Sequence, residues 1–170
     1  MNTRIVYKNG NLLDSTAGVI IHGCNAQGVY NAGVARAVRE KYPEAYQAYM
    51  SHLGHYHQPV DAVGHISIAQ ASDTLLICNG ITQEYYGRTG GPYVTVEAIG
   101  ECFLRISRVM TSEKYTQSKR AVKLHFPKIG TGLGGLNWGV ITPVIDKVAA
   151  EFPAIQYICH ELPDRNTPAA

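Results

Sequence analysis

Two glycine-rich stretches constrain the fold of this chain more than any other feature of its sequence. The first, residues 22–35, holds three glycines and two asparagines, and the second, residues 130–135, holds four glycines; neither contains an acidic residue. Each follows an apolar run typical of a buried strand and precedes a segment whose apolar residues have helical spacing. In an open α/β sheet, loops at such positions lie beyond the carboxyl ends of the strands, where ligands bind.

The segments around these stretches alternate between strand-like and helix-like patterns. We expect strands at residues 3–8, 19–22, 63–69, 74–78, 121–126 and 154–159, and helices at residues 34–50, 94–110 and 139–152. Residues 79–93, with four glycines and a proline, are expected to form a loop. Several of the expected strands are apolar throughout, as in strands buried on both faces. The pattern therefore predicts an α/β fold, a three-layer α/β/α sandwich with a mixed, mainly parallel central sheet.

Local signals refine the expected helices. Pro43 divides residues 34–50 or starts a second helix there, and Thr95 is a candidate cap for residues 94–110. Pro143 is expected in the first turn of the last helix, where proline is tolerated. The expected inner face of that helix consists of Val140, Val144, Ile145 and Val148.

Size and composition indicate one globular domain. Of the 170 residues, 45% are hydrophobic and 16% charged, and we expect residues 1–162 to form a single domain followed by a flexible tail, residues 163–170. The formal net charge of +2 is too small to indicate nucleic-acid binding by charge alone. No apolar run approaches the ~20 residues of a membrane helix, and the N-terminus lacks the apolar core of a signal peptide, so we expect a cytoplasmic protein without a membrane partner.

The four cysteines, Cys24, Cys78, Cys102 and Cys159, show no CxxC spacing. This pattern indicates neither a zinc site nor a disulfide framework, so no metal is expected. Three of them lie in apolar runs and are expected to be buried free thiols, as in a reducing cytosol. Cys24 is the exception, because it borders the first glycine-rich stretch.

The chemistry of the two stretches points to a phosphate-containing ligand. Glycine allows the backbone to approach a ligand closely, and the N–H groups of such loops and of a following helix can hold phosphate. Asn25 can both donate to and accept from a sugar hydroxyl. Neither stretch matches GxxxxGK[ST], and neither matches GxGxxG followed by the expected acidic residue. The residues alone therefore predict a nucleotide-like ligand and leave its identity open.

The sequence resembles the macrodomain family over residues 3–160. The residues that carry the resemblance are 10–13, 21–25, 33–38 with 41–43, and 127–138. It is most similar to small stand-alone members: the yeast-type ADP-ribose-1″-phosphate phosphatase, its phage relatives and the terminal ADP-ribose protein glycohydrolase subgroup. The resemblance implies that the ligand is ADP-ribose or a derivative. We expect a monomer and no cofactor. Nucleic acid is then expected only as an ADP-ribosylated substrate.

The resemblance also assigns roles to individual residues. Asn11 stands where the family usually has an aspartate that recognises the adenine amino group, and the backbone N–H of Leu12 would lie near the base. Asn25 matches the asparagine that contacts the distal ribose. His160 would help to cover the adenine, although an exposed strand-end histidine is an equal alternative. The expected ligand contacts are Asn11, Leu12, Gly23, Cys24, Asn25, Gly33, Val34, Ala35, Ile129, Gly130, Thr131, Gly132, Leu133, Gly134, Gly135, Leu136, Cys159 and His160.

Two departures bear on catalysis. The glycohydrolase subgroup uses a lysine and an aspartate, but residues 79–83 contain no lysine and Gly134 occupies the aspartate position. This disfavours the lysine–aspartate mechanism. For phosphate removal, the candidate catalytic residues are Asn25 and His22. His22 is a general base if it reaches the pocket, or else a structural hydrogen-bonding histidine.

Other residues are further candidates for catalysis or for contacts with the distal ribose. Asp14, Glu84 and His125 are the other possible acid–base groups, while Tyr85, Tyr86 and Arg88 either close over the distal ribose or pack their loop down.

Three functions remain open at this point. The first is hydrolysis of ADP-ribose 1″-phosphate to ADP-ribose and phosphate. The second is a non-catalytic module that binds ADP-ribose or a related signalling nucleotide. The third is removal of ADP-ribose from protein or nucleic acid by a different set of residues.

Overall fold

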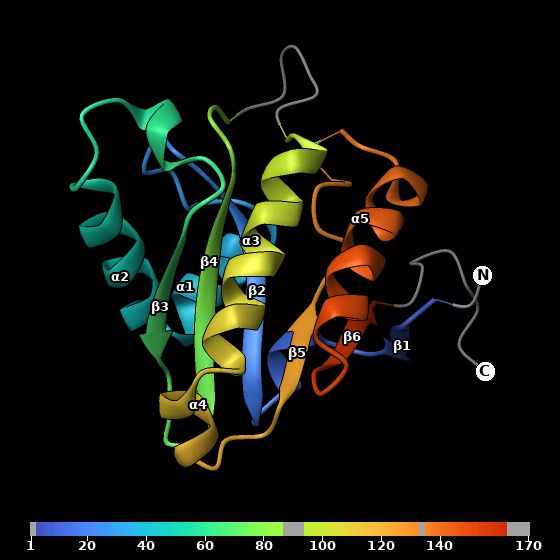
Figure 1. The fold of residues 1–170 in the computed structure, drawn as a ribbon. Helices are drawn as coiled ribbons and strands as arrows, with labels where there is room; N and C mark the ends of the chain where they lie inside the picture. The colour runs from blue at the N-terminus through green and yellow to red at the C-terminus, as the bar shows by residue number, and fades with distance from the viewer. Residues whose placement is uncertain (1–2, 87–93, 133–134, 163–170) are drawn as a thin grey trace.

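A computed structural model describes residues 3–86, 94–132 and 135–162 (Figure 1). Residues 163–170, expected to form a flexible tail, lie outside this part of the chain. The strands are β1 (Ile5–Asn9), β2 (Gly18–Asn25), β3 (Ile66–Gln70), β4 (Leu75–Gln83), β5 (Lys123–Phe126) and β6 (Gln156–Glu161). They form one six-stranded sheet in the order β1-β6-β5-β2-β4-β3. Only β3 pairs antiparallel to its neighbour, so the sheet is mixed and mainly parallel, as predicted.

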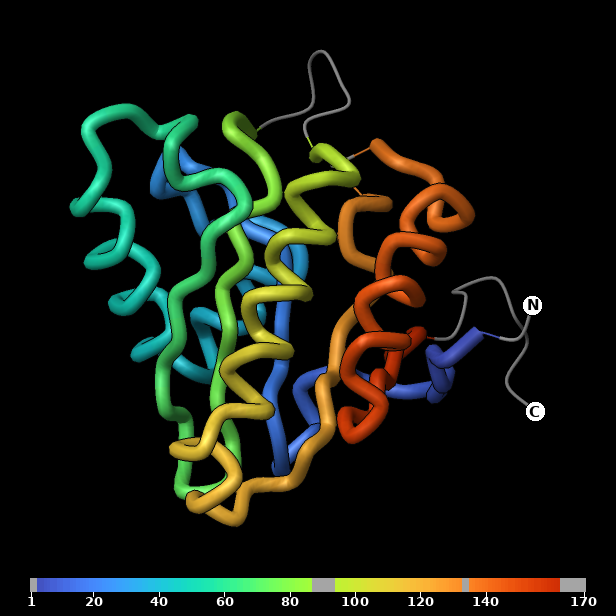
Figure 2. Tube along the Cα trace, in the orientation of Figure 1, coloured from blue at the N-terminus to red at the C-terminus, as the bar shows by residue number. Residues whose placement is uncertain are grey.

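Helices cover both faces of this sheet. They are α1 (Gly33–Lys41), α2 (Pro43–Leu53), α3 (Val96–Met110), α4 (Glu113–Gln117) and α5 (Trp138–Glu151), with 3-10 turns η1 (Leu12–Asp14) and η2 (Pro59–Ala62). Figures 1 and 2 show α3 and α5 side by side on the near face of the sheet and α1 on the far face. The expected α/β/α sandwich is therefore confirmed. Among the described residues, no helix is long and apolar enough to cross a membrane.

Strand alternation builds a separate apolar core on each face. Along β2, Val19 and Ile21 pack into the core that α3 and α5 share with the sheet. Ile20 faces the other way, into the core formed with α1 and α2. Successive side chains of a strand point to opposite faces, so one short apolar run serves both layers. All four cysteines are free and buried, including Cys24.

Two of the local helix signals are confirmed. Pro43 is the first residue of α2. A backbone N–H at this position would have no acceptor within the helix, so proline, which lacks the N–H, is tolerated there. The hydroxyl of Thr95 caps α3 by accepting a hydrogen bond from the Ala98 N–H at 3.1 Å.

Two predictions about element positions are wrong. Residues 79–83 belong to β4 rather than to a loop. Gly80 reads as a turn signal, but a Cβ there would lie 3.2 Å from the Cys102 side chain, so the glycine allows α3 to pack closely. Pro143 lies inside α5, beyond its first turn, and the inner face of α5 includes Ile141 while Val140 is 52% exposed.

Candidate functional site

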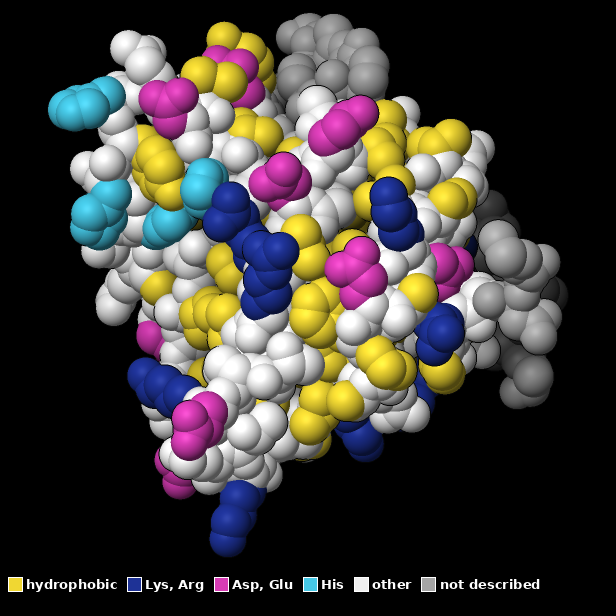
Figure 3. All heavy atoms as spheres, viewed as in Figure 1, with side chains coloured by type: hydrophobic (Ala, Val, Ile, Leu, Met, Phe, Trp, Pro, Cys, Tyr) yellow, Lys and Arg dark blue, Asp and Glu magenta, His cyan; other side chains and the backbone are white. Residues whose placement is uncertain are grey.

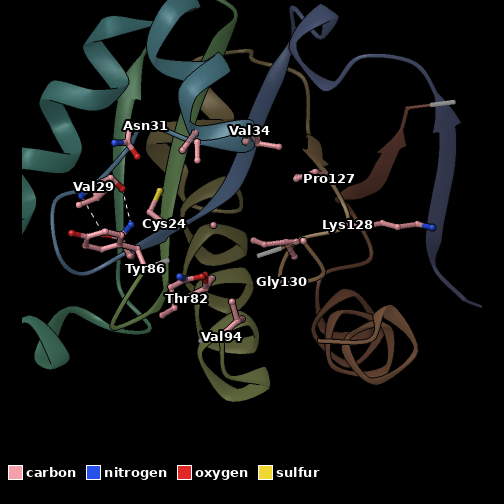
Figure 4. Close-up of a pocket in the computed structure, with 18 residues that line it drawn as sticks. Cys24, Val29, Asn31, Val34, Thr82, Tyr86, Val94, Pro127, Lys128 and Gly130 are labelled. Atoms are coloured by element: carbon pink, nitrogen blue, oxygen red, sulfur yellow. Dashed lines mark hydrogen bonds between the residues drawn. The ribbon is translucent and has the colours of Figure 1, made fainter. Parts of the chain in front are cut away.

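A cavity of about 420 Å³ lies at the carboxyl ends of β2, β4 and β5 (Figure 4). We call it the main cavity. Its walls come from the two glycine-rich stretches and from the end of β4. The lining residues are Gly23, Cys24, Asn25, Val29, Asn31, Ala32, Gly33, Val34, Ala35, Thr82, Gln83, Tyr86, Val94, Pro127, Lys128, Ile129, Gly130 and Gly132.

The N-terminus of α1 forms one wall of the main cavity. The first backbone hydrogen bond of this helix runs from the Arg36 N–H to the Ala32 carbonyl, at 3.3 Å. The N–H groups of Gly33, Val34 and Ala35 therefore have no acceptor within the helix. The cap residue makes no side-chain hydrogen bond, and the first turn contains no acidic residue. These N–H donors and the positive end of the helix dipole suit an anionic group such as phosphate.

The loop after β5 forms the opposite wall and is folded by its own backbone. The Leu136 N–H donates to the Gly130 carbonyl at 2.9 Å, and the Gly135 N–H donates to the Gly132 carbonyl at 3.2 Å. Gly130 has a φ of +84°, and a Cβ there would lie 3.0 Å from Ile99, so this position requires glycine. Among the described residues, the N–H groups of Gly130 and Gly132 are not used in the backbone bonds of this loop. They remain as donors for a ligand.

The side chain of Asn25 closes the first loop on itself. Its Oδ1 accepts from the Gln27 N–H at 2.9 Å, the Val29 N–H at 3.2 Å and the Tyr49 hydroxyl at 2.9 Å. Its Nδ2 donates to the Val29 carbonyl at 2.6 Å (dashed lines at Val29 in Figure 4). The amide expected to contact a sugar is thus engaged by the protein, and it fixes the shape of the loop that borders the cavity.

His22 lies behind the main cavity and does not line it. The residue is fully buried, with Nε2 2.8 Å from Asn79 Oδ1 and 2.7 Å from the Tyr30 hydroxyl. Asn79 Nδ2 in turn donates to the Ala45 carbonyl and to Ser67 Oγ, both at 3.0 Å. Burial lowers the pKa of His22 to about 4, so the ring is neutral at neutral pH. This arrangement favours the structural alternative for His22 over the general base.

The main cavity has little charge of its own. Among its described lining residues there is no carboxylate, and the ionisable side chains are Cys24, Tyr86 and Lys128. Burial raises the pKa of the Cys24 thiol well above its usual value. Lys128 Nζ lies 2.7 Å from Glu161 Oε1, and this hydrogen bond raises the pKa of the lysine. Because Lys128 is ion-paired with Glu161, the wall is close to neutral, and its backbone N–H donors are the feature that suits an anionic ligand.

The structure brings together about half of the residues expected from the sequence. Gly23, Cys24, Asn25, Gly33, Val34, Ala35, Ile129, Gly130 and Gly132 line the main cavity. Asn11, Leu12, Thr131, Gly135, Leu136, Cys159 and His160 do not. Leu12 and Cys159 are buried in the cores on opposite faces of the sheet. Leu133 and Gly134 lie outside the described residues, as does Arg88.

Asn11 and His160 instead line a second cavity of about 330 Å³, together with Asp14 and His125. His125 Nδ1 lies 2.8 Å from His160 Nε2, and His125 Nε2 lies 3.0 Å from the Ala17 carbonyl. Asn11 Oδ1 accepts from the Leu13 N–H at 2.9 Å and so caps η1. Two of the three reserve acid–base groups therefore lie away from the main cavity, and the third, Glu84, does not line it either.

Sequence patterns missed several lining residues. They are Val29, Asn31, Ala32, Thr82, Gln83, Val94, Pro127 and Lys128. Thr82 and Gln83 were hidden because the glycines near them predict a loop, whereas the β-branched pair Ile81 and Thr82 continues the strand. Both Tyr85 and Tyr86 are exposed, but of the two only Tyr86 lines the main cavity.

Comparison with known proteins identifies relatives of this chain. The Macro domain family model matches residues 21–145. A protein of Scheffersomyces stipitis named ADP-ribose 1″-phosphate phosphatase is 27% identical, with 87% of this chain and 96% of that protein covered. A protein of the same name from Ajellomyces capsulatus is 44% identical over 48 residues, which cover 28% of this chain; the match spans only 19% of that relative.

Solved structures share the fold. The macrodomain of Mycobacterium tuberculosis DarG superposes with a TM-score of 0.74 at 21% identity, covering 92% of this chain and 96% of that one. Thermosipho africanus DarTG in complex with ADP-ribose superposes with a TM-score of 0.71 at 17% identity, covering 96% of this chain and 43% of that one.

Acidification is expected to destabilise the fold through His22. Its pKa is about 4 in the folded chain and near 6.5 when unfolded. Between these values the unfolded chain binds more protons, so the stabilisation is fully present above pH 6.5 and is lost as pH falls toward 4. His22 alone should lower the free energy of unfolding by about 2 kcal/mol between pH 7 and pH 5.

Urea denaturation at the two pH values measures this loss. His22→Gln should show a smaller difference between pH 7 and pH 5 than the wild type, whatever its absolute stability. His57→Gln, at an exposed histidine, should leave the difference unchanged. An equal pH dependence in His22→Gln and the wild type would contradict the assignment.

Proposed function

This chain belongs to the macrodomain family, and from that premise we propose that its main cavity binds ADP-ribose or a derivative. The observation that carries the proposal is the pair of N–H walls around one cavity. Gly33, Val34 and Ala35 supply donors from α1, and Gly130 and Gly132 supply donors from the loop after β5. A diphosphate between them would meet donors on two sides and no carboxylate of the described lining.

The rest of the ligand extends from this diphosphate in two directions. One end runs toward β4, where Gly23, Thr82 and Gln83 line the cavity, and holds the distal ribose. The other runs past Pro127 and Lys128 toward β6 and holds the adenosine. In this arrangement Asn25 acts by positioning its loop, whereas Asn11 caps η1 and lines the second cavity, so the adenine contact expected of it from the resemblance stays a prediction.

We further propose that the protein hydrolyses ADP-ribose 1″-phosphate to ADP-ribose and phosphate. Relatives that match most of this chain carry the name of that phosphatase, and a cavity whose described lining has no carboxylate can admit a terminal phosphate. In the reaction, the oxygen of water attacks phosphorus, and the bond between phosphorus and the oxygen attached to C1″ breaks. A proton from the water passes to that ribose oxygen, so the products are ADP-ribose and phosphate. The N–H donors would stabilise the charge of the phosphoryl oxygens. His22 and Asn25 would serve by holding the loop in place.

A non-catalytic binding module is the second candidate. It is favoured by the absence of a carboxylate or an imidazole among the described lining residues of the main cavity.

Removal of ADP-ribose from protein or nucleic acid is less well supported. Residues 79–83 provide no lysine, and acidic and basic side chains are interspersed on the face seen in Figure 3, with no extended basic surface there.

A carboxylate at the N-terminus of α1 should weaken ligand binding without unfolding the protein. Val34 is 38% exposed, lines the main cavity and lies in the first turn of α1. Val34→Glu should be neutral or slightly stabilising, because acidic residues are favourable at helix N-termini. It should also weaken ADP-ribose binding by at least about tenfold through repulsion of the diphosphate. Isothermal titration calorimetry measures the affinity.

Val140→Glu is the matched control. Val140 is 52% exposed in the first turn of α5 and does not line the main cavity. This variant should bind ADP-ribose as the wild type does. If Val34→Glu also retained the wild-type affinity, the diphosphate would not lie at α1.

Phosphate release from ADP-ribose 1″-phosphate tests the reaction. The wild type should release phosphate, and Asn25→Ala should be slower by at least about tenfold, because loss of the loop hydrogen bonds misplaces the substrate. Phosphate release by Val34→Glu, in which the carboxylate repels the substrate from the main cavity, gives the background rate. Wild-type release no faster than that of Val34→Glu, with ADP-ribose still bound by the wild type, would leave the binding module as the function.

A further inference from the structure

Thr82 carries an unpartnered hydroxyl on the wall of the main cavity. The residue is 1% exposed, and its Oγ1 has no hydrogen-bond partner in the described part of the chain. The other two buried atoms without a partner there, on Arg105 and Arg120, belong to residues that do not line this cavity. An unsatisfied buried hydroxyl destabilises a fold, so its presence in a cavity calls for an explanation.

The strand that carries Thr82 is irregular at this residue. Along the β2–β4 pair, Cys24 lies opposite Ile81 and Asn25 lies opposite Gln83, so Thr82 has no residue opposite it. One extra residue in a strand is a β-bulge, and bulges near active sites re-aim side chains. The Thr82 carbonyl accepts from the Thr95 N–H at 3.3 Å. The backbone carbonyl is therefore paired while the side chain is left free.

Gly23 leaves space beside this buried hydroxyl that a larger side chain would fill. A Cβ at position 23 would lie 2.9 Å from Thr82 Oγ1 and 3.1 Å from Ile129 Cγ1. The φ of Gly23 is not in the left-handed region, so glycine is needed here for space rather than for backbone conformation. Figure 4 shows Thr82 on the same wall as Val94, between Tyr86 and Gly130 in the view.

We propose that Thr82 is a specificity-determining residue whose hydroxyl hydrogen-bonds the terminal ribose, or its 1″ substituent, of the bound ligand. This inference rests on the proposed function and names the contact that selects the end of the ligand. A threonine hydroxyl can both donate and accept, which matches a sugar hydroxyl. Thr82 lies on β4, and Lys128 follows β5, which is two strands away in the sheet. With the diphosphate between them, the two ends of the ligand occupy different ends of the cavity.

The test compares two ligands that differ only at that end. Thr82→Val is nearly isosteric and removes the hydroxyl, whereas Thr82→Ser retains it. Calorimetry should show that Thr82→Val binds ADP-ribose about tenfold more weakly than the wild type, as expected for the loss of one hydrogen bond. Its affinity for ADP, which lacks the terminal ribose, should stay within about twofold of wild type. Thr82→Ser should bind both ligands as the wild type does.

Urea denaturation separates this role from a structural one. Thr82→Val should be as stable as the wild type or more so, because it removes an unsatisfied buried hydroxyl. Unchanged ADP-ribose affinity in Thr82→Val would overturn the inference and leave the proposed function intact. Equal weakening for ADP-ribose and ADP would also overturn it. If the wild type bound neither ligand, the proposed function would fail and the inference with it.

Discussion

The parallel pairing of β2 with β4 on one side and β5 on the other is the constraint on which the site depends. Parallel strands end at the same edge of a sheet, so three segments distant in sequence meet there. They are the first loop with the start of α1, the bulged end of β4, and the loop after β5. None of these segments could form a cavity alone, and a shift in register would separate their backbone donors.

A buried polar cluster supports the first loop from behind. Asn79 on β4 links His22, Tyr30 and Ser67, while Tyr49 on α2 bonds both the carbonyl and the side-chain oxygen of Asn25. Such a network is strong when every member is satisfied and costly when one is missing. The polar side chains nearest the cavity therefore act mainly by holding the backbone in place, and the backbone N–H groups remain for the ligand. Thr82 differs, because its buried hydroxyl has no hydrogen-bond partner within the described part of the chain.

Sequence patterns predicted the parts of the fold that depend on local rules. The cap at Thr95, the helix start at Pro43 and the position of both glycine-rich loops follow from residue type and neighbours. The extension of β4 through residues 79–83 could not be predicted in this way, because Gly80 allows close packing against Cys102 and does not form a turn. Local patterns also could not show that the Asn25 amide is used within its own loop. The packing of Gly80 depends on Cys102 in a distant helix, and the Asn25 amide is engaged both by Gln27 and Val29 of its folded loop and by the distant Tyr49, which no hydrophobic or glycine pattern encodes.

The central claim is that backbone donors from α1 and from the loop after β5 hold a diphosphate in one cavity. Amide chemical shifts in an NMR titration with ADP-ribose test it most directly, since they report each N–H separately. The largest changes should fall on Gly33, Val34, Ala35, Gly130 and Gly132. Changes confined to Lys8, His125 and His160 of the second cavity, or no changes at all, would contradict the claim.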